Sequence, residues 1–300
     1  MALPNNLSVG PSGWQRPDWV STVYPKPASR GWHALDILSQ YVNLAEIDQT
    51  FLEPLKPEIA RLYVKKVERN REFLFTALLG RQFTYDRCLG SQAVAAWKNG
   101  VMPLLRAGRL GAVVMQFPWA FRFTEENRQF LIQLRREFHE FPLAAEMRHE
   151  SWLRDEAVTT LVNYHVGMVN IDQPQCFGAM PPTAMLTSGV AVVRLHGRGG
   201  AEAFRDGSGT PGSDYLYDLD ELLEWKPRLE RLAANAARTL VVLANAARGR
   251  AMVNALQMEE ILGDRDLQAP ADLLSIYPAE LAAFRANRPV QAMLLPAQAA

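Results

Sequence analysis

The chain has 300 residues, of which 48% are apolar and 21% are charged, an ordinary composition for a globular protein with a substantial core. Its 32 basic and 32 acidic residues give a net charge of zero, so no overall field would gather nucleic acid or anionic lipid. The two cysteines, Cys88 and Cys176, are too few for a disulfide framework or a cysteine-rich zinc site.

The N-terminal stretch MALPNNLSVGPSGW lacks the basic start and apolar core of a secretory signal. No run of the sequence approaches the roughly 18–20 apolar residues that a membrane helix needs. Two unpatterned cysteines suit a reducing compartment. We therefore expect a cytoplasmic protein with no membrane association.

Short apolar runs alternate with stretches of helical period through the first half of the chain. The expected strands end at Gly10, Asp48, Leu79 and Phe117. The helical patterns cover residues 35–42, 59–67, 94–104 and 130–138. Thr124 is a good N-cap for the last of these helices.

The same alternation continues in the second half. The expected strands end at Met147, Asp172, His196 and Asn245. Helical patterns cover residues 158–165 and 251–262, and Pro227 should kink or split the helix between the last two strands. Residues 173–189 and 197–214 read as loops. A short helical pattern near 278–286 and an apolar tail should pack across the barrel.

Eight strands that alternate with helices predict a parallel α/β fold. The alternation fits a closed barrel and an open doubly wound sheet equally well. However, Gly197, Gly199 and Gly200 open a loop instead of a helix, so the sequence contains no dinucleotide-binding turn. With no linker and no repeat, residues 1–300 are expected to form a single domain.

Six motifs agree in order and spacing with one known family over roughly residues 7–262. They are SGW at 12–14, YVNLAEIDQTF at 41–51, VVMQFP at 113–118, AAEMRHESW at 144–152, VVRLHGR at 192–198 and ANAARGRAMVNAL at 244–256. In these motifs the chain resembles the YecE-like family, domain of unknown function 72. The resemblance implies a TIM-type (β/α)8 barrel, with residues 263–300 as a short C-terminal extension, and it implies no particular reaction.

The chain departs from the family pattern at three positions. Leu78 stands where the family usually carries a lysine, and Tyr85 stands where it carries a histidine. Ala244 replaces the first residue of an Asn-Asn pair. All three lie at the predicted functional end of the barrel, which favours a divergent subgroup with altered chemistry or none.

Polar residues gather at the expected C-terminal ends of the strands, where the active site of such a barrel lies. Alternation places side chains two residues apart on one face of a strand, as for Arg194 and His196. We expect Glu46, Glu146 and His196 to be catalytic. The expected substrate-binding residues are Trp14, Asp48, Gln116, Arg148, His149, Asp172, Arg194, Arg198 and Asn245.

Two interpretations of these residues stay open. Charges inside apolar strands are costly unless they are paired, so Glu46, Glu146 and Arg194 would form a structural ion-pair network. Alternatively, polar groups that converge from six strands form a ligand site. Trp14 likewise either packs a loop onto the barrel or stacks on a sugar or base.

The leading hypothesis is a hydrolase that acts on an anionic, phosphorylated substrate. His196 and a carboxylate would transfer protons, and the helix that follows Asn245 would add backbone N–H groups to the anion site. The arginines expected to bind the anion are Arg148, Arg194, Arg198 and Arg248. A divalent metal is optional, with candidate ligands Glu46, Asp48, Glu146 and Asp172.

Two alternatives belong to other classes. Glu46 and Glu146 would be the paired carboxylates of a glycoside-processing enzyme. The third possibility is a catalytically inactive barrel that binds nucleic acid or protein, which the changes at Leu78, Tyr85 and Ala244 favour. The neutral net charge is an argument against nucleic acid.

Overall fold

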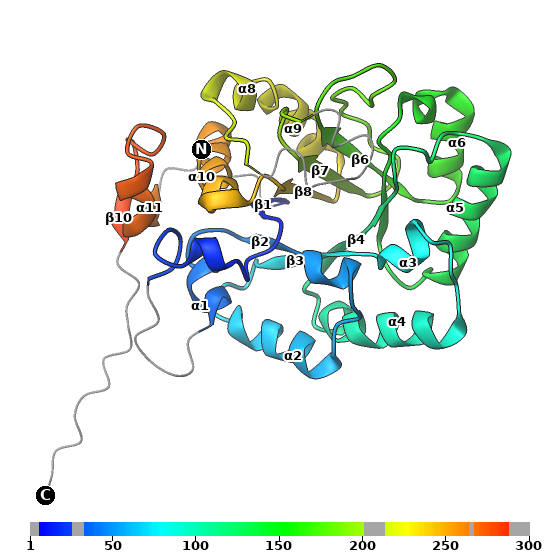
Figure 1. Ribbon diagram of the computed structural model, residues 1–300, viewed down its shortest axis with the longest axis horizontal. Helices are drawn as coiled ribbons and strands as arrows, with labels where there is room; N and C mark the ends of the chain where they lie inside the picture. Colours follow the sequence, from blue (N-terminus) through cyan, green and yellow to red (C-terminus); the bar gives the residue numbers. More distant parts are fainter. Residues whose placement is uncertain (1–5, 26–32, 201–213, 264–266, 288–300) are drawn as a thin grey trace, which may run out of the picture.

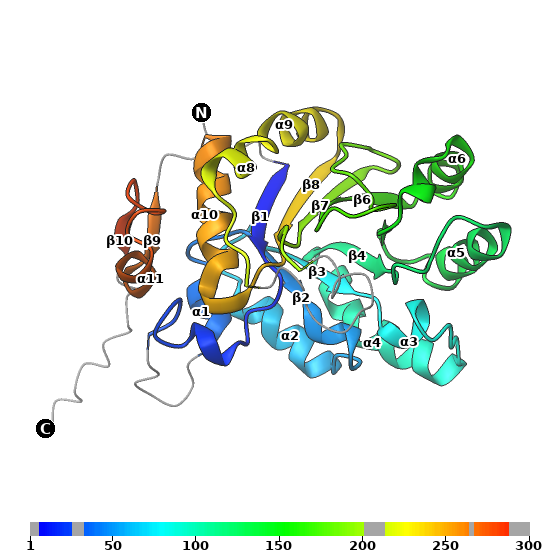
Figure 2. The same ribbon diagram turned by 45° about the horizontal axis from the view of Figure 1, so that its top comes forward.

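The computed structural model describes residues 6–25, 33–200, 214–263 and 267–287 of the chain. Within these residues, eight parallel strands form a nearly closed barrel of the TIM type, with helices between them on the outside (Figures 1 and 2). The barrel predicted from the sequence is confirmed. The strands are β1 (Leu7–Pro11), β2 (Leu44–Ile47), β3 (Leu74–Leu78), β4 (Leu110–Gln116), β5 (Leu143–Glu146), β6 (Gly167–Asp172), β7 (Val190–Leu195) and β8 (Arg238–Leu243).

The helices that connect the strands follow the predicted order. The α-helices of the barrel are α1 (Ala34–Leu38), α2 (Pro57–Lys66), α3 (Arg81–Thr84), α4 (Ser91–Arg106), α5 (Glu125–Glu137), α6 (Asp155–Asn163), α8 (Leu219–Leu223), α9 (Lys226–Asn235) and α10 (Arg250–Leu262). Short 3-10 helices follow several strand ends, namely η1 (Pro17–Trp19), η2 (Asp48–Phe51), η3 (Glu150–Leu153) and η4 (Ala247–Gly249).

Local signals in the sequence explain two helix boundaries. The Thr124 side chain accepts a hydrogen bond from the Asn127 N–H and so caps α5, as expected. Pro227 lies in the first turn of α9, where its missing N–H is tolerated, and the predicted break separates α8 from α9.

The barrel closes at a seam between β1 and β2 that has few strand hydrogen bonds. There, Ser12 pairs with Glu46 in a single bridge, and the Gly13 N–H donates to the Glu46 carbonyl at 2.9 Å. The Asn43 side chain accepts a bond from the Val9 N–H at 2.9 Å. Gly10 allows this approach, because a Cβ atom at that position would lie 1.8 Å from the Leu44 carbonyl oxygen. The contacts between β1 and β2 therefore extend as far as Glu46.

Apolar side chains fill the barrel interior below its C-terminal end. They are Leu44, Leu78, Ala112, Val114, Ala144, Val169, Val192, Leu240 and Val242. A larger apolar layer lies between the strands and the surrounding helices. Because side chains alternate along a strand, residues two positions beyond this interior layer, such as Glu46 and Arg194, face the mouth of the barrel.

The C-terminal extension differs from the prediction. It contains β9 (Gln268–Pro270), α11 (Ala271–Ile276) and β10 (Arg285–Asn287), so the helix precedes the segment near 278–286 where it was expected. Pro278 follows the end of α11 closely, as is common because proline cannot continue a helix. The extension lies on the outer side of α10 and not across the barrel (Figures 1 and 2). The predicted apolar tail, 288–300, lies outside the described residues.

The Gln257 side chain of α10 donates to the Glu280 carbonyl at 3.1 Å, and Tyr277 donates to the Arg248 carbonyl at 2.9 Å. These bonds attach the extension to α10 and to η4, which precedes it. In the part of the chain that the structure describes, no helix has the length and apolarity to cross a membrane.

Candidate active site at the barrel mouth

Arg194 lies at the centre of the mouth and joins strands from opposite sides of the barrel. Its Nη2 donates to Glu46 Oε1 at 2.7 Å, and its Nη1 donates to Gln116 Oε1 at 3.0 Å and to Glu146 Oε2. Arg194 is 2% exposed, and both carboxylates are fully buried. The structure thus brings four of the expected residues together through one guanidinium group.

Glu46 receives two further hydrogen bonds. Ser12 Oγ donates to Glu46 Oε1 at 2.6 Å, and Thr76 Oγ1 donates to Oε2 at 3.4 Å. Thr76 was not among the residues predicted from the sequence. Its hydroxyl stands inside an apolar strand on the same face as Leu78, and that alternation could have placed it at the mouth.

Glu146 binds three cationic or potentially cationic groups. His196 Nε2 lies 3.1 Å from Glu146 Oε2, and Arg148 Nε donates to Oε1 at 3.2 Å. Burial alone would raise the pKa of Glu146, but Arg194, His196 and Arg148 together hold that pKa well below its ordinary value of 4.5. Glu146 is therefore an ionised carboxylate at neutral pH.

His196 is in its neutral form at neutral pH. Burial lowers its pKa below the ordinary value of 6.5, although the adjacent Glu146 acts in the opposite direction. Because Glu146 is ionised and can only accept, Nε2 of His196 carries the proton and Nδ1 holds the lone pair. The pair consists of a neutral imidazole and an ionised carboxylate that accepts its Nε2–H.

Arg148 and Asp48 lie at the edge of this network. Arg148 is half-buried, and Asp48 is exposed at the start of η2. Gly13 has a φ of +73° and lies against the Asp48 carboxylate, to which a Cβ would approach within 2.5 Å. The rim of the mouth therefore presents one cationic and one acidic side chain beside the buried network.

Asp172 and Arg198 belong to a second cluster, which faces the helices. Asp172 Oδ2 accepts from Arg198 Nη2 at 2.9 Å and from the Trp225 indole at 2.8 Å. Arg198 Nη2 also donates to Glu224 Oε2 at 2.7 Å. Val169 points into the barrel, so alternation turns Asp172 outward. Trp225 and Glu224 were not predicted as members of this cluster, because nothing in their spacing links them to strand β6.

Three other expected residues have separate surroundings. Trp14 is buried and packs edge-on against Tyr63, 5.1 Å between ring centroids, in agreement with the loop-packing interpretation. His149 caps η3 by accepting a bond from the Ser151 N–H at 3.1 Å. The buried Asn245 amide donates to the Asn254 side chain at 2.7 Å. The structure does not link these three side chains to the Arg194 network.

The expected four-arginine anion site is not assembled. Arg198 binds the carboxylates of the second cluster, and the exposed Arg248 pairs with Asp214 at 3.5 Å. The Arg248 N–H in η4, just before the last helix, donates to the Asp18 carboxylate at 2.6 Å. The Asp18 carboxylate thus binds the backbone N–H that was expected to bind an anion. Only Arg148 and Arg194 contact the network.

The candidate metal ligands are not grouped either. Asp172 is directed to Arg198 and Trp225, away from Glu46 and Glu146, whose oxygens bind Arg194. Across residues 6–25, 33–200, 214–263 and 267–287, no three His, Cys, Asp or Glu side chains come together in a way that could hold a metal ion.

The three departures from the family pattern have plain structural settings. Leu78 joins the apolar interior layer of the barrel. Tyr85 follows α3 and packs edge-on against Phe51 at 5.4 Å. Ala244 extends the sheet, since its N–H donates to the Leu195 carbonyl at 2.8 Å.

Comparison with known proteins finds relatives over most of the chain. A family model described as "Protein of unknown function DUF72" matches residues 8–274. The UPF0759 protein YunF of Bacillus subtilis (strain 168) is 24% identical over 272 residues, which are 85% of this chain and 94% of that protein.

Two crystal structures of DUF72 family proteins are similar in fold. The Thermotoga maritima MSB8 protein has a TM-score of 0.72 and 27% identity, covering 86% of this chain and 99% of that one. An Enterococcus faecalis V583 protein has a TM-score of 0.74 and 21% identity, covering 86% of this chain and 96% of that one.

Proposed function

The chain belongs to the DUF72 family of proteins of unknown function, and we propose that it is a hydrolase-type enzyme acting on a small anionic, phosphorylated substrate at the barrel mouth. The observation that carries this proposal is the 3.1 Å contact between His196 Nε2 and the buried, ionised Glu146. A histidine held by a carboxylate is a common arrangement for general-base catalysis.

In this proposal, His196 activates the attacking water. Glu146 accepts a hydrogen bond from Nε2–H and so fixes the tautomer in which Nδ1 is the base. The water gives a proton to Nδ1 as its oxygen bonds to phosphorus, and the P–O ester bond breaks on the opposite side. The leaving oxygen takes a proton from solvent, and the imidazolium then releases its own proton to solvent. Glu146 stabilises the positive charge that His196 acquires in the first step.

The two arginines have different roles here. Arg194 pairs with Glu46 and Glu146 and holds them in place, since both carboxylates contact its guanidinium group. Arg148 lies at the half-buried rim and contacts one oxygen of Glu146. We assign the anion of the substrate to Arg148, because a guanidinium group at the rim can bind phosphate oxygens without leaving the buried network unpaired.

The geometry favours this reading over the glycosidase alternative. Paired catalytic carboxylates need the sugar between them, whereas Arg194 binds both Glu46 and Glu146. The non-catalytic barrel stays a prediction. Its support is the apolar setting of Leu78, and no feature of the described surface singles out nucleic acid or a protein partner.

Phosphate binding and phosphoester hydrolysis test the proposal together. We expect inorganic phosphate to raise the melting temperature of the wild type, and 4-nitrophenyl phosphate or its diester to be hydrolysed. Arg148→Met should lose most of the phosphate effect. Arg106→Met, an exposed arginine at the end of α4, should keep it. No phosphate effect and no hydrolysis in the wild type would contradict the proposed substrate class.

A further inference from the structure

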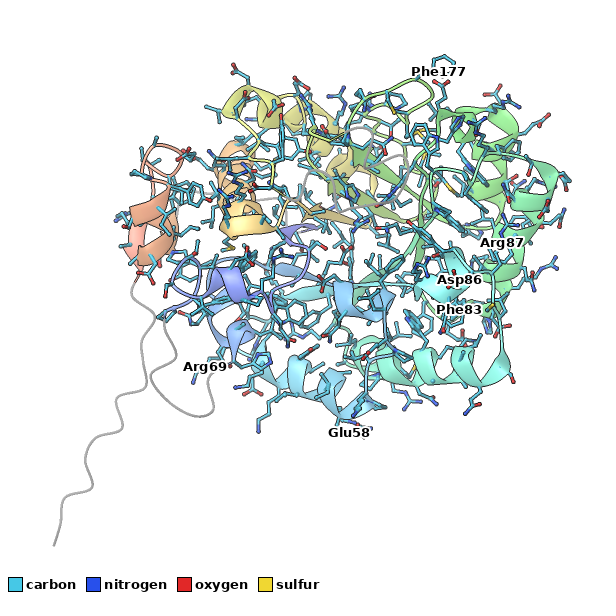
Figure 3. The ribbon with its side chains drawn as sticks, in the orientation of Figure 1. Glu58, Arg69, Phe83, Asp86, Arg87 and Phe177 are labelled. Atoms are coloured by element: carbon cyan, nitrogen blue, oxygen red, sulfur yellow. The ribbon has the colours of Figure 1, made fainter. Side chains whose placement is uncertain are left out.

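A cavity of about 420 Å³ lies outside the barrel, between the segments that follow β1 and β2 and the beginning of α2. Its lining includes Gln15, His33, Gln49, Leu52, Lys56 and Tyr63. We call it the α2 pocket. Figure 3 labels Glu58 in the first turn of α2, which marks this end of the helix on the outside of the barrel. The pocket shares no lining residue with the Arg194 network.

Tyr63 forms the polar floor of the α2 pocket. The ring is buried, and its hydroxyl oxygen accepts bonds from Gln49 Nε2 at 2.8 Å and Gln15 Nε2 at 3.3 Å. Burial raises the pKa of Tyr63, so the phenol keeps its proton. With both acceptor positions used, the remaining capacity of the hydroxyl is to donate. No acceptor for this O–H is present among the described side chains and carbonyls.

His33 adds a second donor beside Tyr63, with 5.8 Å between the two ring centroids. His33 Nδ1 accepts from the Leu35 N–H at 3.2 Å, so the proton of the neutral ring is on Nε2. Burial and the charge of Lys66 lower the pKa of His33, which keeps the ring neutral at pH 7. Its Nε2–H is thus a neutral donor.

Lys56 supplies the positive charge at the rim of the α2 pocket. It is exposed, and within the described ranges no carboxylate pairs with it. Lys56 is also the N-cap of α2, and no side chain caps this helix end, so the positive end of the helix dipole adds to the charge. Glu53 is the one acid of the lining, and it is exposed.

The opposite part of the lining is apolar. Leu52 is 77% exposed and Leu62 is 37% exposed, and Ile59 is half-buried beside them. Small-molecule sites typically combine apolar walls with a few convergent polar groups, in cavities of about 300–1,000 Å³. The size and the lining of the α2 pocket fit this description.

We propose that the α2 pocket binds a small carboxylate that carries an apolar body. The carboxylate accepts hydrogen bonds from Tyr63 Oη and His33 Nε2 and pairs with Lys56, and the apolar body covers Leu52 and Ile59. The apolar walls select an organic acid over inorganic phosphate. This site is independent of the proposed hydrolase function, and each can fail without the other.

Calorimetric titration with phenylacetate tests the site. We expect saturable binding at millimolar concentrations or below, with phenylacetamide and acetate at least tenfold weaker because each lacks one half of the recognised chemistry. Tyr63→Phe removes the donor, together with the acceptor of the Gln49 and Gln15 amides. It should weaken phenylacetate about tenfold, the effect of one hydrogen bond to a charged group. Tyr277→Phe in the extension is the matched control and should leave binding unchanged.

Two exposed positions keep the test decisive if Tyr63→Phe fails to fold. Leu52→Ser and Lys56→Gln should each weaken phenylacetate binding, while Leu223→Ser, an exposed leucine on α8, and Glu146→Gln at the mouth should not. The proposal is overturned if the wild type shows no saturable binding. It is equally overturned if phenylacetate binds with the same affinity to the Leu52, Lys56 and Tyr63 variants.

Discussion

Arg194 on β7 and Glu46 on β2 form an ion pair across the barrel mouth, with 2.7 Å between Nη2 and Oε1. The same guanidinium group binds Glu146, and all three side chains are almost fully buried. Removing one partner of a buried ion pair leaves an uncompensated charge, which costs about 3–5 kcal/mol. We therefore expect Arg194→Met to lower the free energy of unfolding by about that amount in urea titrations.

Arg106→Met provides the control for this prediction, because that arginine is exposed and should change stability by no more than about 0.5 kcal/mol. If Arg194→Met unfolds at the wild-type urea concentration, Arg194 does not hold the two carboxylates, and its role would be confined to ligand binding.

The close approach of β1 to β2 should make Gly10 intolerant of any side chain. A Cβ there would lie 1.8 Å from the Leu44 carbonyl oxygen, so Gly10→Ala must shift the seam. Overpacking of this kind costs about 1–3 kcal/mol or more. Gly90→Ala, where no atom lies within 4 Å of the new Cβ, should stay near wild type. Equal melting temperatures for the two variants would show that the seam is not this tight.

Acid should destabilise the protein through Glu146. Its pKa is well below 4.5 in the folded state, so the folded state binds this proton less readily than the unfolded state does. The resulting stability is present above pH 4.5 and is lost as the pH falls through the folded-state pKa. Glu146→Gln should be less stable at pH 7, but its unfolding free energy should depend less on pH below 4.5. An unchanged pH dependence in urea titrations would argue against an ionised, ion-paired Glu146.

Arg198 should act in stability and not in anion binding. Its guanidinium group binds Asp172 and Glu224, and losing such charged hydrogen bonds costs about 1.5–3 kcal/mol. Arg198→Met should therefore melt earlier than the wild type, yet retain the shift that inorganic phosphate causes. Loss of that shift in a folded Arg198→Met protein would return Arg198 to the anion site.

The strand and helix pattern could be predicted because it depends on local periodicity. Every expected strand end lies within two residues of the observed one, and Pro227 separates α8 from α9 as expected. The extension was placed less well, because its helix is six residues long and ends before Pro278. Such a short segment has too few turns for a clear period.

The candidate site could be predicted only in part. The alternation of side chains along β7 predicts that Arg194 faces the mouth of the barrel. The same rule on β2 and β5 predicts that Glu46 and Glu146 face it too. The orientation of Asp172 could not be predicted, because β6 carries the apolar residues Met168 and Val169 on opposite faces, so its sequence does not reveal which face points into the barrel. Trp225 binds Asp172 from 53 residues away, a contact that only the packing of the helices on the barrel determines.

The central claim is that His196 is the base of an active site, and one kinetic comparison tests it most directly. His196→Gln is compared with the wild type and with the control His139→Gln, on the phosphoester that is hydrolysed fastest. His139 is an exposed histidine in the turn that follows α5. We expect kcat/KM of the wild type to rise with pH through a midpoint below 6.5, the ordinary pKa of histidine, because burial lowers the pKa of His196. His196→Gln should lose about 100-fold or more of kcat/KM, and His139→Gln should lose nothing. A His196→Gln protein that is folded and retains the wild-type kcat/KM would contradict the account.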